Sequence, residues 1–366
     1  MPTQHMPPLR QRYPAPGTSA FTILELLVGM TLFAVVLGIA LSAVGTITSV
    51  YKSTGADAES FHKARVAFAN LSNALSGATL HTYYDYEYPN NTTKAQPDRL
   101  VLKSGLHFLS GPVREVFGST ASGGGVRTPA HGVLFQAPAG HVDDQKDFGH
   151  LDSLLNVMGF YLEYGKGDRY APAFLRDTNV KHDRFRFRLI QVTQPADKSE
   201  IYKSTSDDKY DTDWVKALSL DSPVRGDKHV LAENIIALVI RPKDPGTDLP
   251  SATDIAPKYT YDSRRWERAN AETSDIKRRN QLPPIIEVTM VSTDEHSAEL
   301  IETLAPGNAP AFLGVSDLFR NASDAAHRRD LDRLRRKLDE HKIPYRIFSA
   351  SIPLPETGWT TAAPTI

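Results

Sequence analysis

Hydrophobic residues are distributed very unevenly along this chain of 366 residues. Residues 1–20 are polar and carry the arginines Arg10 and Arg12 but no acid. An apolar run over residues 21–51 follows, with Glu25 as its only charged residue before Lys52. A helix needs about 20 apolar residues to cross a bilayer core, so this run is long enough to span a membrane. The positive-inside rule then places residues 1–20 in the cytoplasm and the rest of the chain outside.

A helical pattern continues beyond the apolar run. Alanines and large apolar residues recur there at helical spacing, namely Phe61, Ala64, Ala67, Phe68, Leu71, Ala74 and Leu75. We therefore expect one helix from residue 21 to about residue 76, about 84 Å long at 1.5 Å per residue. Its first half, residues 21–51, would lie in a membrane or fibre core. Its amphipathic second half, residues 52–78, would pack on a sheet.

The body, residues 79–355, shows mainly strand patterns and is followed by a tail over residues 356–366. Strands are predicted at residues 99–103, 132–136, 157–164, 184–192, 235–241, 285–291 and 345–352. Within one of them, Phe185-Arg186-Phe187-Arg188-Leu189 puts apolar residues on one face and arginines on the other, which predicts a half-buried antiparallel strand.

Two further segments complete the expected fold. Residues 324–341 predict a late amphipathic helix with leucines on one side and mixed, solvated charges on the other. The polar stretch over residues 244–280 predicts a long loop or insertion. The fold class is therefore α+β: a long N-terminal helix, membrane-spanning in its first half, packed on a mainly antiparallel β body.

Composition and motifs argue against an enzyme. The chain has no cysteine, so it has no disulfide and no thiolate site, and its net charge of −1 gives no global attraction to nucleic acid. It carries no phosphate-binding loop, nucleophile elbow or zinc-protease motif. We therefore expect no catalytic residue, no cofactor and no metal.

Three local clusters are candidate sites. One acidic run combines histidines with carboxylates and would suit a metal ion, and a second run of carboxylates at short spacing would suit calcium, but a solvated polar loop is the favoured interpretation of each. A cluster of arginines with one tryptophan would suit a binding patch, but acids beside it favour a surface loop. The first acidic run contains His141, Asp143, Asp144, Asp147, His150 and Asp152, the second Asp207, Asp208, Asp211 and Asp213, and the arginine cluster Arg264, Arg265, Trp266 and Arg268.

The N-terminal segment has two plain interpretations. A secretory signal has an apolar run of about 7–15 residues before a small-residue cleavage site; this run is about twice as long, although residues 40–42 would fit such a site. An uncleaved signal anchor would span equally well. However, it leaves Glu25 unexplained, because a carboxylate in a membrane costs about 2–3 kcal/mol or more.

A third interpretation rests on the junction Ser19-Ala20-Phe21-Thr22-Ile23-Leu24-Glu25. This junction resembles the type IV prepilin signature for cleavage and methylation, which has a small residue before the cut, Phe after it and Glu fifth in the mature chain. The chain departs from the signature at Ala20, where Gly is usual. The resemblance implies cleavage between Ala20 and Phe21, with the apolar helix retained. It also implies that Glu25 pairs with the new amino group of Phe21 in a neighbouring subunit; a carboxylate at headgroup level is the alternative.

A second resemblance extends through the body. The run from Val230 to Pro242, the segment Tyr259-Thr-Tyr-Asp-Ser-Arg264 and the run from Gln281 to Glu295 resemble the C protein of the Verru_Chthon cassette, as does Pro344-Tyr-Arg-Ile-Phe-Ser349. This is a family of pilin-like proteins encoded in clusters in Verrucomicrobia and related bacteria. The step from Leu282-Pro283 into a strand is also similar to the J-type minor pseudopilins of type II secretion.

These resemblances imply a structural minor pilin-like or pseudopilin-like subunit with one inner-membrane span and a periplasmic body. It would assemble into, or prime, a pilus-like fibre of a secretion or type IV pilus-like system. The implied partners are prepilin peptidase, other pilin-like subunits and membrane lipid. The alternative is a membrane-anchored binding or enzymatic domain that joins no fibre. DNA handling is a third interpretation, which the balanced charge disfavours.

Overall fold

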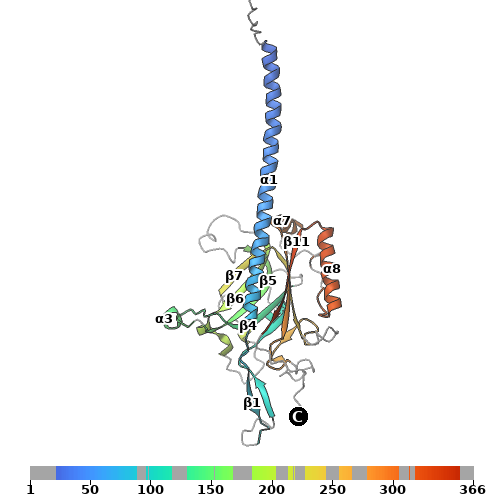
Figure 1. Ribbon diagram of the computed structural model, residues 1–366. Coiled ribbons are helices and arrows are strands. Elements are labelled where there is room, and N and C mark those ends of the chain that lie inside the picture. The colour runs from blue at the N-terminus through green and yellow to red at the C-terminus, as the bar shows by residue number, and fades with distance from the viewer. Residues whose placement is uncertain are drawn as a thin grey trace, which may run out of the picture. The chain divides into compact units, whose positions relative to one another are not determined.

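The computed structural model describes residues 22–88, 96–97, 99–117, 130–151, 153–167, 184–202, 213–216, 218, 227–244, 255–265, 278–304, 313 and 318–354 (Figure 1). The chain divides into two units, residues 1–54 and residues 55–366. As expected, the fold class is α+β, with an apolar N-terminal helix and a body built mainly on antiparallel strands.

The helix α1 runs from Ile23 to Ser76 and supplies turns to both units. Within the second unit, Ala64, Ala67, Leu71 and Leu75 are buried in the core of the body. These residues follow the helical spacing of the sequence, so one face of the helix is covered while the other stays in water.

Contacts beside this buried face attach α1 to one sheet. The ring of Phe68 lies 5.9 Å from the ring of Phe348 in β11 (Tyr345–Pro353), measured between centroids. The guanidinium of Arg346, in the same strand, lies 4.6 Å from the ring centroid of Phe61. The later turns of α1 are therefore part of the folded body.

The body contains a six-stranded, a three-stranded and a two-stranded antiparallel sheet among its described residues. The strand orders are β7-β6-β5-β4-β3-β9, β11-β10-β8 and β1-β2. The strands are β1 (Tyr83–Glu87), β2 (Arg99–Lys103), β3 (Leu109–Pro112), β4 (His131–Pro138), β5 (Leu155–Lys166), β6 (Phe185–Gln194), β7 (Asp227–Glu233), β8 (Ile235–Lys243), β9 (Tyr261–Asp262), β10 (Ile285–Thr293) and β11.

A single residue joins the two larger sheets. Asn234 separates β7, at one edge of the six-stranded sheet, from β8 in the three-stranded sheet. Its φ of 63° lies in the left-handed region, which asparagine tolerates better than most residues. Its N–H donates to the carbonyl of Phe187 in β6, and its carbonyl accepts from the N–H of Thr293 in β10. This residue therefore ties both sheets together where the chain changes sheet.

All the strands predicted from the sequence are confirmed within two or three residues at their ends, as β2, β4, β5, β6, β8, β10 and β11. The strands β1, β3, β7 and β9 were not predicted. β3 and β9 are short, and β7 carries charged residues among its apolar ones. Their strand state depends on the neighbours to which they hydrogen-bond, which a single segment does not reveal.

The prediction that β6 is half-buried is wrong. Arg186 and Arg188, expected in solvent, are 3% and 4% exposed. The reason is that acidic partners cover this second face: Glu295 and Glu302 of α7 (Glu295–Leu304) bind Arg186, and Glu233 of β7 binds Arg188. A polar residue in an alternating strand can thus be buried when it is paired.

The interpretation of residues 244–280 as a polar loop is also wrong for part of the stretch. Tyr259 and Tyr261 are fully buried, and Tyr261 lies in β9, which pairs with β3. Asn280 is buried as well and donates to the carbonyl of Leu102 in β2. The described part of this stretch therefore contributes to the core.

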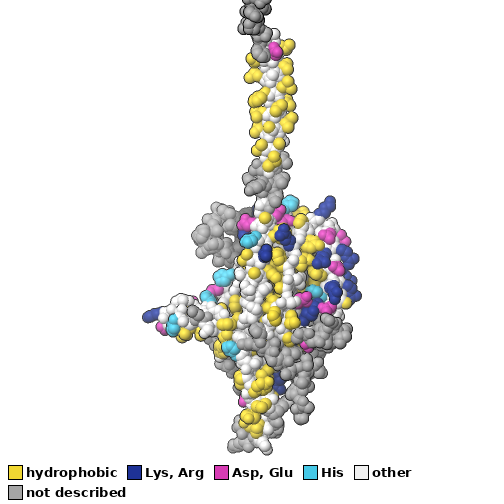
Figure 2. All heavy atoms as spheres, viewed as in Figure 1, with side chains coloured by type: hydrophobic (Ala, Val, Ile, Leu, Met, Phe, Trp, Pro, Cys, Tyr) yellow, Lys and Arg dark blue, Asp and Glu magenta, His cyan; other side chains and the backbone are white. Residues whose placement is uncertain are grey.

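The helix α8 spans Asp324–Glu340, where the sequence predicts a helix over residues 324–341. Leu334 and Leu338 are buried in the core, and Lys and Arg side chains lie on the outer side (Figure 2). Two of its acids face the body: Asp324 pairs with Arg241, and Asp330 accepts from the N–H of Phe319 at 2.8 Å. Basic side chains thus lie on the outer side of α8, while two of its acidic side chains bind groups of the body.

Candidate functional site

Every residue of α1 from 23 to 45 is exposed, and Figure 2 shows the apolar side chains along one side of this part of the helix. Residues Ile23–Gly45 form a segment long and apolar enough to cross a membrane, judged by length and composition. None of this segment is buried, and Ile23, Leu24 and Phe33 are among its most exposed side chains. Soluble proteins rarely expose so continuous an apolar surface, so this segment is the first candidate for a functional surface.

The segment begins with a capped turn. The hydroxyl oxygen of Thr22 accepts a hydrogen bond from the N–H of Glu25 at 3.2 Å. Thr22 followed three residues later by Glu25 is a capping-box sequence, and the cap satisfies one of the free amide groups at a helix start. The Glu25 side chain is exposed on this first turn. The predicted processing residues Ala20 and Phe21 lie outside the described residues.

Several side chains of the first acidic run that the structure describes form ion pairs and a helix cap. His141 Nε2 lies 2.9 Å from Asp227 Oδ2, and Asp143 pairs with Lys198. Asp144 caps the short helix α3 (Gln145–Phe148) by accepting from the N–H of Lys146. Among the described residues, no group of three or more His, Asp or Glu side chains is placed to hold a metal ion. Asp152 lies outside the described residues, as do Asp207, Asp208 and Asp211.

The arginine cluster is only partly described. Arg264 donates from Nη2 to the carbonyl of Gly105 at 2.6 Å, so it holds two loops of the body together. Trp266 and Arg268 lie outside the described residues. The structure therefore brings no basic patch together from the described members of this cluster.

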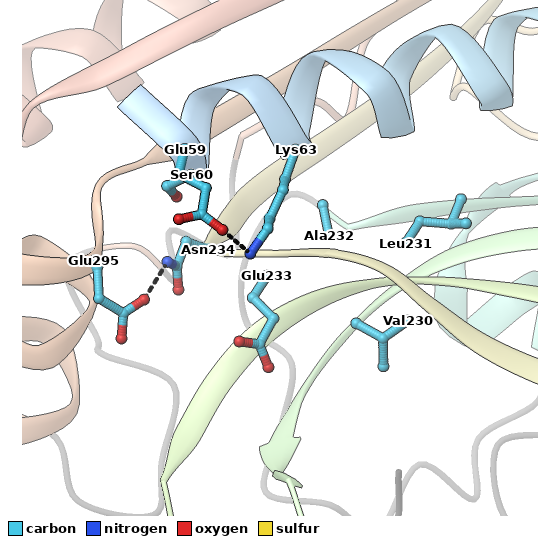
Figure 3. A pocket seen from close by; sticks show the side chains of 9 residues that line it. All are labelled: Glu59, Ser60, Lys63, Val230, Leu231, Ala232, Glu233, Asn234 and Glu295. Carbon is cyan, nitrogen blue, oxygen red and sulfur yellow. Dashed lines mark hydrogen bonds and ion pairs between the residues drawn. The ribbon is translucent and has the colours of Figure 1, made fainter. Parts of the chain in front are cut away.

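A second candidate site is a groove that the sequence did not predict (Figure 3). It has a volume of about 500 Å³ and lies between α1 and the edge strand β7, with α7 at one end. Its lining residues are Glu59, Ser60, Lys63, Val230, Leu231, Ala232, Glu233, Asn234 and Glu295.

Carboxylates dominate the polar lining of the groove. Glu59 pairs with Lys63 one turn further along α1, at 2.7 Å (Figure 3). The hydrogen bond between the two side chains lowers the pKa of Glu59 and raises the pKa of Lys63. Glu233 Oε1 lies 2.8 Å from Arg188 Nε. Both side chains of the Glu59–Lys63 pair are largely exposed, so the pair adds little stability and remains available to a ligand.

Glu295 closes the inner end of the groove. Its two oxygens bind Arg186 Nη2 at 2.9 Å and Asn234 Nδ2 at 2.7 Å. Burial alone would raise the pKa of Glu295, but the hydrogen bonds from Asn234 and Arg186 outweigh it, and the pKa is lowered. Glu295 is therefore a fixed carboxylate with both oxygens committed.

Asn234 brings an unsatisfied acceptor to the same place. The residue is 3% exposed, and its Oδ1 has no hydrogen-bond partner among the described residues. Its Nδ2 is held by Glu295, which fixes the orientation of the amide (Figure 3). A buried carbonyl oxygen without a donor costs about 1–3 kcal/mol; because this oxygen is closed to solvent, it destabilises the groove wall and does not itself face a ligand in the groove.

Sequence reasoning missed this groove because its residues come from three separated segments. Glu59 and Lys63 belong to the helix, Glu233 and Asn234 to the junction of β7 and β8, and Glu295 to α7. The Asn234 position offered one signal, since an asparagine between two apolar strand patterns often adopts a left-handed conformation. Nothing in the sequence indicates that α1 lies beside it.

Comparison of the chain with protein-family models, with characterised proteins and with solved structures gives no significant match.

Proposed function

We propose that the protein is a membrane-anchored, pilin-like structural subunit without a catalytic role. The observation that carries the proposal is the exposed apolar segment Ile23–Gly45, which begins at a capped turn with Glu25 as its only charge. The same helix supplies Leu71 and Leu75 to the core of the body. A cut at residues 40–42 would fall inside this unbroken helix, whereas a cut before Phe21 leaves it whole, so the continuity of the helix supports retention of the segment in the mature protein.

Glu25 supports assembly as well as anchoring. At the edge of a bilayer a carboxylate is costly unless a cation lies close to it. The amino group created at Phe21 by cleavage is such a cation, and in a neighbouring subunit it would be free to pair with Glu25. The proposed partners are accordingly prepilin peptidase, other pilin-like subunits and inner-membrane lipid, with the body in the periplasm.

The size of the body supports a minor position in the fibre. Helices in a tightly packed bundle lie about 10 Å apart, which leaves little room around each helix for a large body. The second unit, residues 55–366, is such a body. It fits at a tip or at low copy number more easily than along a shaft. Their contacts with neighbours would be of the head-to-tail type.

Mass spectrometry of the mature N-terminus tests this proposal. We expect the protein purified from membranes to begin at Phe21. We expect Glu25→Gln to be cleaved normally but to fall by about a hundredfold in the sheared fibre fraction, since loss of one buried ion pair is worth about 3 kcal/mol. Arg65→Gln, which removes an exposed charge in the body part of the same helix and lies outside the groove, serves as the matched control and should assemble normally.

Three results would contradict the proposal. A mature chain that begins at Met1 would indicate an uncleaved anchor and would favour a membrane-anchored binding or enzymatic domain. A chain that begins near Ser42 would indicate an ordinary secretory signal. Long homogeneous fibres formed by the purified protein alone would contradict the minor position.

A further inference from the structure

We propose that the edge of β7 is a docking site for an extended segment of a partner polypeptide. The segment adds a strand to β7 along the groove and places a lysine or arginine side chain among the carboxylates of the groove. The inference concerns an interaction surface of the body. It holds whether or not the chain is cleaved or assembled into a fibre.

The first argument is the position of β7 at the end of its sheet. β7 pairs with β6 on one side and is the terminal strand of the six-stranded sheet among the described residues. A terminal strand presents backbone N–H and carbonyl groups that can pair with another chain. Lys228, a residue type that discourages such pairing, lies near the start of β7, whereas the groove lies along its other end.

The second argument is the way in which β7 lines the groove. A strand that faces a cavity with one side contributes alternate residues, because successive side chains point to opposite faces. Here the five consecutive residues from Val230 to Asn234 all line the groove (Figure 3). The groove therefore runs along the backbone edge of the strand, over about 17 Å at 3.4 Å per residue.

The third argument is the direction of the backbone groups. Because the N–H of Asn234 donates to Phe187 in β6, alternation along an antiparallel strand turns the N–H and carbonyl of Glu233 away from β6. The register shift between Leu189 and Ile190 leaves Leu231 without an opposite residue in β6. Among the described residues, the backbone N–H and carbonyl of Glu233 thus have no sheet partner on the groove side.

The fourth argument identifies the side chain that the partner brings. Carboxylate oxygens outnumber donors in the groove, because Glu59 and Glu233 each engage only one oxygen in the ion pairs described above. Lys63 is the main donor and is already shared with Glu59. Hydrogen bonds to charged groups are stronger than neutral ones, so a basic side chain fits this lining better than an apolar or acidic one.

Binding of synthetic peptides to the full-length protein in detergent micelles tests the inference. The probe is an extended peptide of alternating valine and threonine with one central lysine. We expect it to slow hydrogen exchange of the amides over residues 230–234 by about tenfold. We expect it to bind about tenfold more tightly than the same peptide with glutamate at the centre, since a charge-assisted hydrogen bond is worth about that factor.

Two controls separate strand addition from other binding. A peptide with N-methylated amides on its pairing edge keeps its charge but cannot pair with β7, and it should not protect residues 230–234. In the protein, Leu231→Lys adds a charge to the edge and should weaken binding of the lysine peptide about tenfold. Leu151→Lys, at an exposed leucine outside the groove, should leave binding unchanged.

Other outcomes would overturn the inference. If neither peptide protected residues 230–234, β7 would not be a site of strand addition. Equal binding of the lysine and glutamate peptides would remove the assignment of a basic side chain. Unchanged binding by Leu231→Lys, with circular dichroism showing an intact fold, would place the peptide elsewhere.

Discussion

Lowering the pH from 7 to 5 should destabilise the body by about 4 kcal/mol, because two buried histidines remain neutral when it is folded. His131 is fully buried, and its Nδ1 lies 3.1 Å from the backbone nitrogen and 3.2 Å from the carbonyl oxygen of Ile240. His327 is buried beside Tyr259, with 3.1 Å between Nδ1 and Oη. Burial lowers the pKa of each histidine from 6.5 to about 4.

The sign follows from these directions. Between pH 6.5 and about 4 the unfolded chain binds a proton at each histidine and the folded chain does not, so protonation stabilises the unfolded state as the pH falls. The contribution of the neutral histidines to the free energy of unfolding is fully present above about pH 6.5 and is lost progressively toward pH 4. At pH 5 the loss is about 2 kcal/mol for each histidine.

Urea unfolding at pH 7 and pH 5, followed by circular dichroism, measures this loss. Asparagine keeps an acceptor oxygen near the position of Nδ1 but does not titrate. In the double variant His131→Asn and His327→Asn, the difference between the two pH values should therefore shrink by about 4 kcal/mol. His62→Asn, at an exposed histidine, should keep the full difference. An unaltered difference in the double variant would contradict the assignment.

Replacing Arg186 by methionine should lower the free energy of unfolding by about 3 kcal/mol, toward the lower end for breaking a buried ion pair. Its guanidinium is 3% exposed and binds Glu302 Oε2 at 2.6 Å and Glu295 Oε1 at 2.9 Å. Without it, both carboxylates of α7 would keep their charge in a partly buried place. Because Glu295 and Glu302 retain some contact with water, the loss of stability should be smaller than for a fully buried ion pair.

The neighbouring Arg184 offers a matched control. It pairs with Glu299 at 3.0 Å, but its side chain is 67% exposed. Arg184→Met should change stability by less than about 1 kcal/mol, because water screens an exposed pair. Adding Glu295→Gln and Glu302→Gln to Arg186→Met should recover part of the loss, since no unpaired charge then remains. Equal losses at the two arginines would contradict the buried role of Arg186.

Much of the fold is readable from local patterns. The strands β5 and β8 are largely apolar and β10 alternates apolar and polar residues, so local patterns predict all three, and α1 follows from its continuous helical spacing. The candidate membrane segment is also a local property, because length and hydrophobicity decide whether a helix can span. Glu25 stands out for the same reason, as one charge in an apolar run.

Other features depend on neighbours that are distant in the sequence. The alternation in β6 does not reveal that α7 lies more than a hundred residues further on and covers its arginines. Nor does the sequence show that β7 ends its sheet beside Glu59 and Lys63 of α1. Burial of a charge is decided by whether a partner is present, and only the tertiary structure brings that partner into place.

The sequence alone thus determined that a long apolar helix carrying one acid precedes a body of α+β class. Hydrophobic length and periodicity are summed over adjacent residues, so no knowledge of the fold is needed to read them. The groove at β7, with its committed carboxylates and its unsatisfied Asn234, exists only because three segments meet there. Hydrogen bonding and ion pairing act over a few ångströms, so they are decided by which residues the fold makes neighbours.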